Sequence, residues 1–469
     1  MNSDFKNTVK CLDGLLKPDI NFDLVKRNLI IAERQAAMYF VDGYIKDEVF
    51  EKILEFFYKI TPDEISKIPD METFSFIKIP YVEVDYTSDV DKACTQILSG
   101  PTALVIEGID GILLIDTRTY PTRSINEPDK DKSLRGSRDG FVETLIFNTA
   151  MIRRRIRDVN LRMEYMQVGK VSKVDVAICY LDGVADKKTV EILKNKLKKI
   201  DLRGISMTHQ AIGEGLVHTN FFNPFPKFKY TERPDYTSAS IIDGRIVLIM
   251  DNSPSVMILP VSFADFFREI DDYYFSPAVA TYNRIMRWVV SLLTVLATPL
   301  FTLAVNHADM VPQWLQFILP DEKVVPSVFI QFLVLEFVID GLKLASVNTP
   351  SSLSSALGII GGLLLSELAI SAGWFNTQTI LFMAFVAITT YSQPSFEMGY
   401  AMKFARMFIL ILTQIFALYG FIGGIVLNIL IMLWSSTLNG RGYLYPIFPF
   451  NKRKLLGLFL RKNIYKSEK

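Results

Sequence analysis

The chain has 469 residues, and its 51 lysine and arginine residues against 50 aspartate and glutamate residues give a formal net charge of +1. This balance gives no reason to expect a nucleic acid as the partner. Half of the residues are hydrophobic and the mean hydropathy is +0.24, which excludes a wholly soluble protein. Because residues 1–277 have the composition of a soluble protein, the excess of apolar residues lies in the C-terminal part.

Three cysteines, Cys11, Cys94 and Cys179, are scattered along the chain without CxxC spacing or paired histidines. This pattern argues against a zinc site or a disulfide framework, so we expect no metal, no cofactor, and buried thiols in a reducing compartment. Residues 1–19 contain charges throughout and lack the apolar core of a secretory signal. We therefore expect whatever precedes the first membrane span to stay in the cytoplasm.

The first soluble subdomain is expected over residues 1–134. Between Val25 and Phe57, apolar residues recur at helical spacing, with a stop at Asp42-Gly43, which predicts one helix before the stop and a second over Lys46–Tyr58. Short strands are expected over residues 74–84, 102–108 and 111–117, the last two joined by a hairpin-like turn. A charged loop, Pro121–Leu134, ends the subdomain.

The second soluble subdomain is expected over residues 135–277. Its predicted elements are a helix over Asp139–Arg157, strands over Leu161–Val168 and Val174–Leu181, a helix over Lys187–Ile200, and strands over residues 238–243, 245–251 and 255–259. No repeat is long enough to indicate a solenoid. The two subdomains together predict a mixed α/β fold for the cytosolic part.

Two basic segments of the second subdomain have alternative interpretations. Ser137 or Asp139 would begin a helix between arginines, and such a helix N-terminus can hold a phosphate or carboxylate. The run Arg153–Asp158 is more typical of contacts between domains or subunits. The three histidines have no partners at a catalytic or metal-binding spacing, and no GxSxG, HExxH or Walker signature occurs. We therefore expect no enzymatic activity.

The linker Pro260–Pro277 places Phe263, Phe266 and Phe267 among acidic and basic residues. An amphipathic helix of this kind can lie at the membrane interface, and it directly precedes the first apolar segment. An ordinary helix packed on the soluble part is the alternative.

Five apolar segments predict a polytopic α-helical membrane domain over residues 278–440, followed by a basic cytosolic tail over residues 441–469. The segments are Trp288–Val305, Val325–Leu344, Ala356–Trp374, Ile380–Ser392 and Met407–Trp434. The distribution of lysine and arginine between the connections places the soluble part and the tail inside, which requires an even number of crossings. Either the glycines within residues 420–424 divide the last segment into a hairpin, or one short segment is re-entrant.

The second apolar segment carries three charged residues on one face. Glu336, Asp340 and Lys343 are spaced i, i+4 and i+7, so they share one arc of a helix. Charges within a membrane usually face a bundle interior or a water-filled path, and one interpretation is that these residues line a cation pore. The alternative is an anchoring ion pair between Asp340 and Lys343. Glu367, in the third segment, is a further pore-lining candidate or a hydrogen-bonded helix contact.

Six separated motifs resemble one known family. They are RGSRDGFVETLIFNTAMIRRRIRD (135–158), SKVDVAICYLDGVAD (172–186), NPFPKFKYTERPD (223–235), DNSPSVMILP (251–260), NTPSSLSSALG (348–358) and YLYPIFPFN (443–451). Together they are similar to the GerA family of spore germination proteins, from residue 70 onward. Within the family, the YTERPD and SPSVMI forms resemble a stage V sporulation type rather than a nutrient receptor A subunit.

The resemblance implies a multi-pass protein of the spore inner membrane with a two-part cytosolic N-terminal domain. It also implies a homo-oligomer, such as a pentamer, that conducts monovalent cations beside germinant receptor subunits or with a small membrane partner. The competing function is a membrane scaffold that clusters germination receptors without conducting. A third function, dipicolinate transport, would need a basic membrane path, which Lys343 alone hardly provides.

Overall fold

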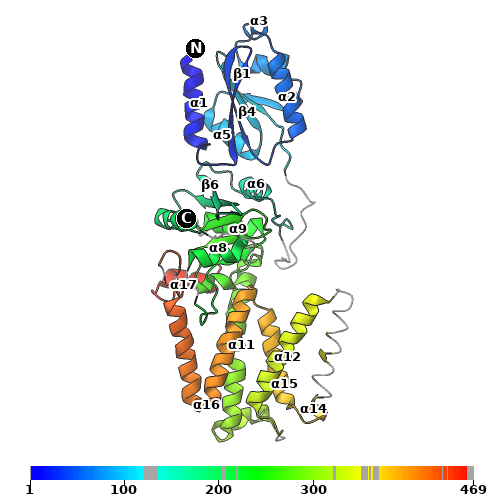
Figure 1. Ribbon diagram of the computed structural model, residues 1–469, viewed down its shortest axis with the longest axis vertical. Helices are drawn as coiled ribbons and strands as arrows, with labels where there is room; N and C mark the ends of the chain where they lie inside the picture. The colour runs from blue at the N-terminus through cyan, green and yellow to red at the C-terminus, as the bar shows by residue number, and fades with distance from the viewer. Residues whose placement is uncertain are drawn as a thin grey trace. The chain divides into compact units, whose positions relative to one another are not determined.

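The computed structural model describes residues 2–120, 136–201, 208–217, 220–320, 324–349, 358, 361–362, 369–435, 437–440 and 442–461 (Figure 1). The chain forms two compact units. The first comprises Met1–His218 and Phe228–Val261, and the second comprises Thr219–Lys227 and Ser262–Lys469. The predicted loop Pro121–Leu134 and the candidate residue Glu367 lie outside the described residues, as does most of the predicted segment Ala356–Trp374.

The first unit contains two antiparallel five-stranded sheets with helices, which confirms the predicted mixed α/β fold. The strand order of the first sheet is β1-β2-β4-β5-β3. Its strands are β1 (Leu24–Ile31), β2 (Arg34–Val41), β3 (Val84–Thr87), β4 (Thr102–Ile106) and β5 (Ile112–Ile115). Its helices are α1 (Asn2–Leu16), α2 (Asp47–Lys59), α3 (Pro62–Ile65), α4 (Met71–Lys78) and α5 (Val90–Ser99).

The first sheet is covered on both faces. Ala36 and Met38 of β2 belong to a core shared with α2, α3 and α4, whereas Ala37 and Tyr39 of the same strand belong to a core shared with α1 and α5. Successive side chains of a strand point to opposite faces, so a strand buried on both faces is apolar at nearly every position. For this reason β4 and β5 are continuous apolar runs that are buried throughout.

Residues 24–41 form a hairpin, so the helix predicted there is wrong. Ile31 of β1 lies opposite Arg34 of β2, and the turn residues Ala32 and Glu33 have φ angles of 48° and 61°. A two-residue turn with positive φ at both positions is usually marked by Asn-Gly or a similar pair. The Ala-Glu pair lacks this mark, and the helical spacing of the apolar residues therefore misled the prediction. The second predicted helix, Lys46–Tyr58, is confirmed as α2.

Residues 74–84 are not the single strand that their composition predicted. Asp70 accepts a hydrogen bond from the Thr73 amide at 2.8 Å and caps α4, whose Met71 and Phe74 are buried one turn apart. A side-chain cap followed by an i, i+3 apolar pair favours a helix, and β3 begins only at Val84. The strands predicted over residues 102–108 and 111–117 are confirmed as β4 and β5, which pair antiparallel.

The second sheet has the strand order β6-β7-β9-β10-β8. Its strands are β6 (Leu161–Val168), β7 (Val174–Leu181), β8 (Lys229–Thr231), β9 (Ile246–Met250) and β10 (Val256–Leu259), and its helices are α6 (Leu145–Arg155), α7 (Lys187–Lys198), α8 (Thr208–Leu216) and α9 (Pro234–Ile242). The predicted strands β6, β7, β9 and β10 and the predicted helix α7 are confirmed, whereas β8 and α8 were not predicted.

Two boundaries in the second sheet region differ from the prediction. Residues 238–243, predicted as a strand, belong mostly to α9, whose first turn contains Pro234. The hydroxyls of Thr237 and Ser238 donate to carbonyls four residues earlier at 2.8 Å, which satisfies these polar groups inside a helix. α6 begins at Leu145 rather than Asp139, because the preceding segment pairs elsewhere through the Phe141 amide and the Glu232 carbonyl at 2.8 Å.

The expected burial of the cysteines holds for two of the three. Cys94 and Cys179 are buried, whereas Cys11 is exposed on α1 beside Leu12, which faces the core. Burial raises the pKa of the Cys94 thiol to about 11, so this thiol stays protonated at neutral pH.

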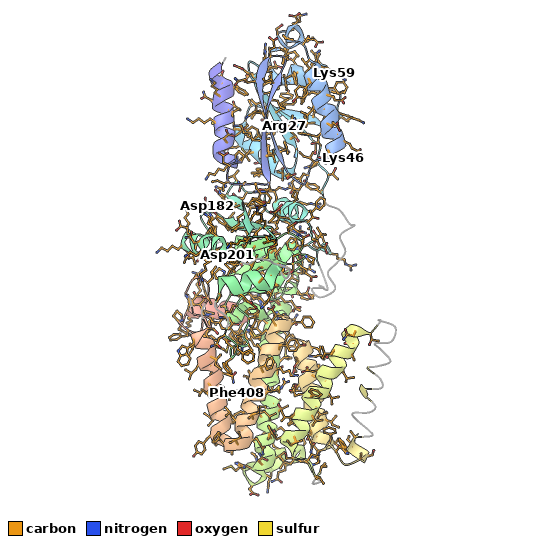
Figure 2. The ribbon with its side chains drawn as sticks, in the orientation of Figure 1. Arg27, Lys46, Lys59, Asp182, Asp201 and Phe408 are labelled. Atoms are coloured by element: carbon orange, nitrogen blue, oxygen red, sulfur yellow. The ribbon has the colours of Figure 1, made fainter. Side chains whose placement is uncertain are left out.

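The second unit is mainly helical (Figure 1). Its longer helices are α11 (Pro277–Asn306), α12 (Val328–Asn348), α15 (Thr377–Tyr391), α16 (Phe396–Trp434) and α17 (Lys452–Phe459), and its short ones include α14 (Ala369–Ser371), η2 (Ala308–Met310) and η3 (Gln313–Ile318). Among the described residues, α11 and α16 are long and apolar enough to cross a membrane, and α15 is a shorter apolar helix. Figure 2 shows the side chains, with Phe408 marking α16.

α16 is a helical hairpin rather than one straight helix. Helical geometry is interrupted at Ala417, where φ is 49° and ψ is −129°. A Cβ atom on Gly424 would lie 3.1 Å from the Cα atom of Ile409, and one on Gly420 would collide with the Leu412 carbonyl. Residues 409 and 424 would be about 22 Å apart in a straight helix, so the chain must fold back. Of the two alternatives for the last segment, the structure supports the hairpin, with its break three residues before Gly420.

The linker Pro260–Pro277 is divided between η1 (Phe263–Phe267) and α10 (Asp271–Tyr274), so the single amphipathic helix predicted there is wrong. Phe266 and Phe267 are buried, and the ring of Phe267 stacks on Trp288 of α11 with centroids 4.2 Å apart. These phenylalanines therefore cover protein surface within the second unit.

Candidate functional site

The charged face of α12 packs against the first arm of α16. Arg406 donates to Glu336 through Nε at 2.8 Å and through Nη2. Lys403 places its Nζ atom 3.2 Å from Oε2 of Glu336 and also pairs with Asp340. Two carboxylates thus meet two cations, and their formal charges cancel. These four residues are called the charge cluster below.

Helical spacing on both sides builds the charge cluster. Glu336 and Asp340 are four residues apart on α12, and Lys403 and Arg406 are three residues apart on α16, so each pair shares one face of its helix. Arg406 reaches a third helix, because its Nη1 atom donates to the Thr294 carbonyl of α11 at 3.0 Å. One guanidinium therefore joins α11, α12 and α16.

Burial differs sharply between the two carboxylates. Glu336 is 4% exposed and Arg406 is 2% exposed, whereas the Asp340 side chain is 37% exposed. Removing a charge from water costs several kcal/mol, which only close pairing offsets. Glu336 therefore depends on its partners. Asp340 is only partly exposed, and its Oδ1 atom is buried without a hydrogen-bond partner among the described residues.

Lys343 forms no ion pair with the two acids of its own helix among the described residues. Its Nζ atom is 4.6 Å from the ring centroid of Tyr391 and 5.4 Å from that of Tyr400, which is cation–π geometry. Asp340 pairs with Lys403 of α16, so the predicted alternative of an ion pair with Lys343 is not what the structure shows. The structure brings Glu336 and Asp340 into one cluster, directs the Lys343 ammonium to two tyrosine rings, and does not describe Glu367.

Lys403 and Arg406 are the members of the charge cluster that sequence reasoning missed. In the sequence, both counted only as basic residues before the last apolar segment. They were part of the lysine and arginine distribution from which the membrane topology was predicted. Their i, i+3 spacing, like the i, i+4 spacing of Glu336 and Asp340, places two charges on one helix face. The opposite sign of the two pairs was the sequence feature that could have indicated their contact. The two arrangements are separated by 63 to 70 residues, so the sequence did not show that they meet.

The basic segments of the first unit serve internal contacts. Burial tends to raise the pKa of Asp139, but hydrogen bonds from Ser137 and Arg155 outweigh it and lower the pKa. Arg155 donates to Asp139 at 2.8 Å, so a carboxylate of the chain occupies the position where an anion was considered. Arg153 pairs with Asp23, so this residue of the run joins two segments 130 residues apart within the first unit.

His209 is a buried histidine of α8 between two serines. Its Nε2 atom bonds to Ser253 Oγ and lies 3.0 Å from Ser255 Oγ, while Nδ1 has no hydrogen-bond partner among the described residues. Burial lowers the pKa of His209 to about 4. The imidazole is therefore neutral at neutral pH. Within the described part of the chain, no three His, Cys, Asp or Glu side chains are grouped to hold a metal ion.

The burial of His209 predicts an acid-sensitive first unit. Its pKa of about 4 lies below the ordinary value of 6.5, so between these values the unfolded state binds more protons and stability falls as the pH is lowered. Urea unfolding of residues 1–261 should show a loss of about 2 kcal/mol from this group between pH 7 and pH 5. His209→Gln should remove that part of the pH dependence. An equal loss in both proteins would contradict the prediction.

A family model matches nearly the whole chain. The family model described as Bacillus/Clostridium GerA spore germination protein matches residues 11–469. The chain belongs to the GerA family. Family membership, which the six motifs predicted, is thereby confirmed across both units.

Individual members of the GerA family are similar over most of their length. Stage V sporulation protein AF of Bacillus subtilis (strain 168) is 33% identical over 446 residues, which cover 94% of this chain and 89% of that protein. Spore germination protein KA of the same organism is 29% identical over 455 residues, covering 95% and 82%. The similarity to the stage V protein agrees with the YTERPD and SPSVMI forms.

One solved structure covers part of the chain. The crystal structure of the N-terminal domain of the A subunit of the Bacillus megaterium spore germinant receptor GerK3 matches with 24% sequence identity and a TM-score of 0.42. The match covers 54% of this chain and 94% of that chain.

Proposed function

We propose that the chain is a subunit of an oligomeric cation channel of the spore inner membrane that acts with germinant receptor subunits during germination, and is not an enzyme. The observation that supports this function is the charge cluster inside an apolar helical unit, with Asp340 partly exposed. Ionisable residues in membrane helices usually face a bundle interior or a water-filled path. In a ring of copies, such as a pentamer, one Asp340 from each copy would form a ring of acids that favours cations.

Exposed apolar side chains support a membrane location for the second unit. Leu292 and Leu300 of α11, Ile388 of α15 and Ile415 of α16 are each more than half exposed. From Arg287 to Asn306, α11 is about 28 Å long, close to the thickness of the hydrocarbon core. The α16 hairpin supplies two passes and so favours an even number of crossings, with the N-terminal domain and the tail both cytosolic.

A membrane scaffold that clusters germination receptors remains the competing function. It is favoured by the close pairing of Glu336 with Arg406 and Lys403. A cluster whose charges compensate each other needs no role beyond holding α11, α12 and α16 together. The two functions differ in the role of Asp340. A channel would use its carboxylate to line the cation path, and a scaffold would not.

Substitution of Asp340 tests the channel. The full chain is reconstituted into vesicles loaded with K⁺, and Asp340→Asn is expected to reduce K⁺ efflux roughly tenfold, since it removes one charge per copy from the proposed path. Asp309→Asn, an exposed acid in η2 away from α12, is the matched control and should leave efflux unchanged. Size in detergent reports whether the variants assemble.

The same vesicles separate the two functions. Normal efflux from an assembled Asp340→Asn protein would overturn the proposed role of α12 in lining a path. No efflux from the wild-type protein, together with retained assembly with receptor subunits, would favour the scaffold.

A further inference from the structure

Exposed aromatic side chains gather around the C-terminal end of α16. Trp434 is the last residue of that helix and is 81% exposed. Two neighbouring stretches contribute further exposed rings, namely Phe221 and Phe222 from the loop of residues 220–227, and Phe448 and Phe450 from the segment that precedes α17. Five large rings left in water are unfavourable for a protein surface, which indicates that something covers them.

Specific contacts tie the loop of residues 220–227 to the chain beyond α16. The side-chain amide of Asn223 donates to Ser435 Oγ at 2.6 Å, and the hydroxyl of Tyr443 donates to the Pro226 carbonyl at 2.8 Å. The rings of Phe225 and Tyr443, both buried, lie 6.4 Å apart. The exposed aromatic residues therefore belong to one anchored structure at one end of the helical unit.

Three consecutive basic residues follow the exposed rings. Lys452, Arg453 and Lys454 begin α17 and are all exposed. Among the described residues none of the three forms an ion pair, and the one contact of Lys454 with a ring places its Nζ atom 5.4 Å from the centroid of Tyr445. Their combined charge is uncompensated within the described part of the chain, so an anionic partner would complement it.

We propose that this surface binds the headgroups of anionic phospholipids. The surface consists of Phe221, Phe222, Trp434, Phe448, Phe450, Lys452, Arg453 and Lys454, and it is called the headgroup surface below. The inference rests on the proposed membrane location of the second unit. Aromatic rings favour the boundary between hydrocarbon and headgroups, and lysine and arginine beyond them are attracted to anionic lipid.

The order of residue types along the chain matches the layers of a bilayer. An apolar helical arm ends at Trp434, the exposed rings follow, and the basic residues come last. α17 lies at the N-terminal end of α11, because Arg284 donates to the Gly457 carbonyl at 3.1 Å. At the C-terminal end of α11, Trp314 and Phe317 are also exposed, but residues 307–320 contain no lysine or arginine. Among the described residues at the two ends of α11, basic side chains beside exposed rings therefore occur at the end that carries the headgroup surface.

Lipid titration of the full chain tests the inference. The protein is purified in a nonionic detergent, phosphatidylglycerol or phosphatidylcholine is added, and Tm is followed against the mole fraction of lipid. We expect phosphatidylglycerol to stabilise the wild-type protein at lower mole fractions than phosphatidylcholine. The variant K452Q/R453Q/K454Q should need on the order of 100-fold more phosphatidylglycerol for the same rise in Tm, with its response to phosphatidylcholine unchanged.

Matched variants make the outcome specific. K188Q/K198Q/K199Q removes three exposed lysines in and beside α7 of the first unit and should keep the wild-type response, as should the charge-conserving K452R/K454R. Equal responses of the wild-type protein to both lipids, or a wild-type response from K452Q/R453Q/K454Q, would overturn the inference. K⁺ efflux in phosphatidylcholine vesicles measures the proposed channel independently, so failure of the lipid preference with normal efflux concerns the headgroup surface alone.

Discussion

Replacing Arg406 by methionine is expected to lower the free energy of unfolding of the helical unit by about 3 to 5 kcal/mol. The guanidinium is 2% exposed and contacts both Glu336 and the Thr294 carbonyl. Without it, the buried Glu336 keeps only Lys403, which it already shares with Asp340, and the charge cluster carries an uncompensated negative charge. A large fall in Tm in detergent, measured by circular dichroism, would report the loss.

Two further variants distinguish charge imbalance from lost packing. In E336M/R406M the remaining pair, Asp340 and Lys403, is neutral, so much of the stability lost in R406M should return. Lys343→Met removes a cation whose side-chain contacts, among the described residues, are with two tyrosine rings, and it should cost far less. A double variant that melts no higher than R406M would show that packing around Arg406, and not charge balance, stabilises the unit.

The sequence indicated half of the charge cluster because the signal was local. Glu336 and Asp340 stand out as charges in an apolar helix, and their spacing alone shows that they share a face. Their partners lie on another helix, and contact between distant segments depends on helix packing that periodicity does not specify. The predicted competing pair of Asp340 with Lys343 was the nearest local solution. The structure instead pairs Asp340 with Lys403 across the helix interface.

The fold was predictable where composition and turn chemistry agreed. β6 and β7 were predicted at their observed bounds, because turn-forming residues such as Asn160 and Gly169 flank these runs. The β1–β2 hairpin was missed because Ala32 and Glu33 adopt a turn that Asn-Gly would normally signal. The break at Ala417 shows a similar limit, since the nearby glycines suggested a hairpin without fixing its tip. In each case the pairing of two adjacent segments imposed a conformation that the residues at the turn do not predict.

Replacing Asp23 by asparagine is expected to destabilise the first unit by about 3 to 5 kcal/mol and to separate the unfolding of its two halves. Arg153 donates to Asp23 through Nε at 2.8 Å and through Nη2 at 3.1 Å, and both side chains are at most 1% exposed. Asp23 directly precedes β1 of the first sheet, and Arg153 lies on α6, which packs with the second. Asparagine keeps the shape but leaves a buried guanidinium without its counter-charge.

Urea unfolding of residues 1–261 distinguishes the buried pair from an ordinary ion pair. Lys170→Met is the matched control, because Lys170 contacts Asp201 (labelled in Figure 2) at 2.6 Å with both side chains more than half exposed. Exposed pairs contribute about 0 to 1 kcal/mol, so this variant should unfold almost like the wild-type protein. D23L/R153M, which removes both charges, should recover much of the stability lost in Asp23→Asn. A single, unshifted transition in Asp23→Asn would mean that apolar packing alone joins the two halves.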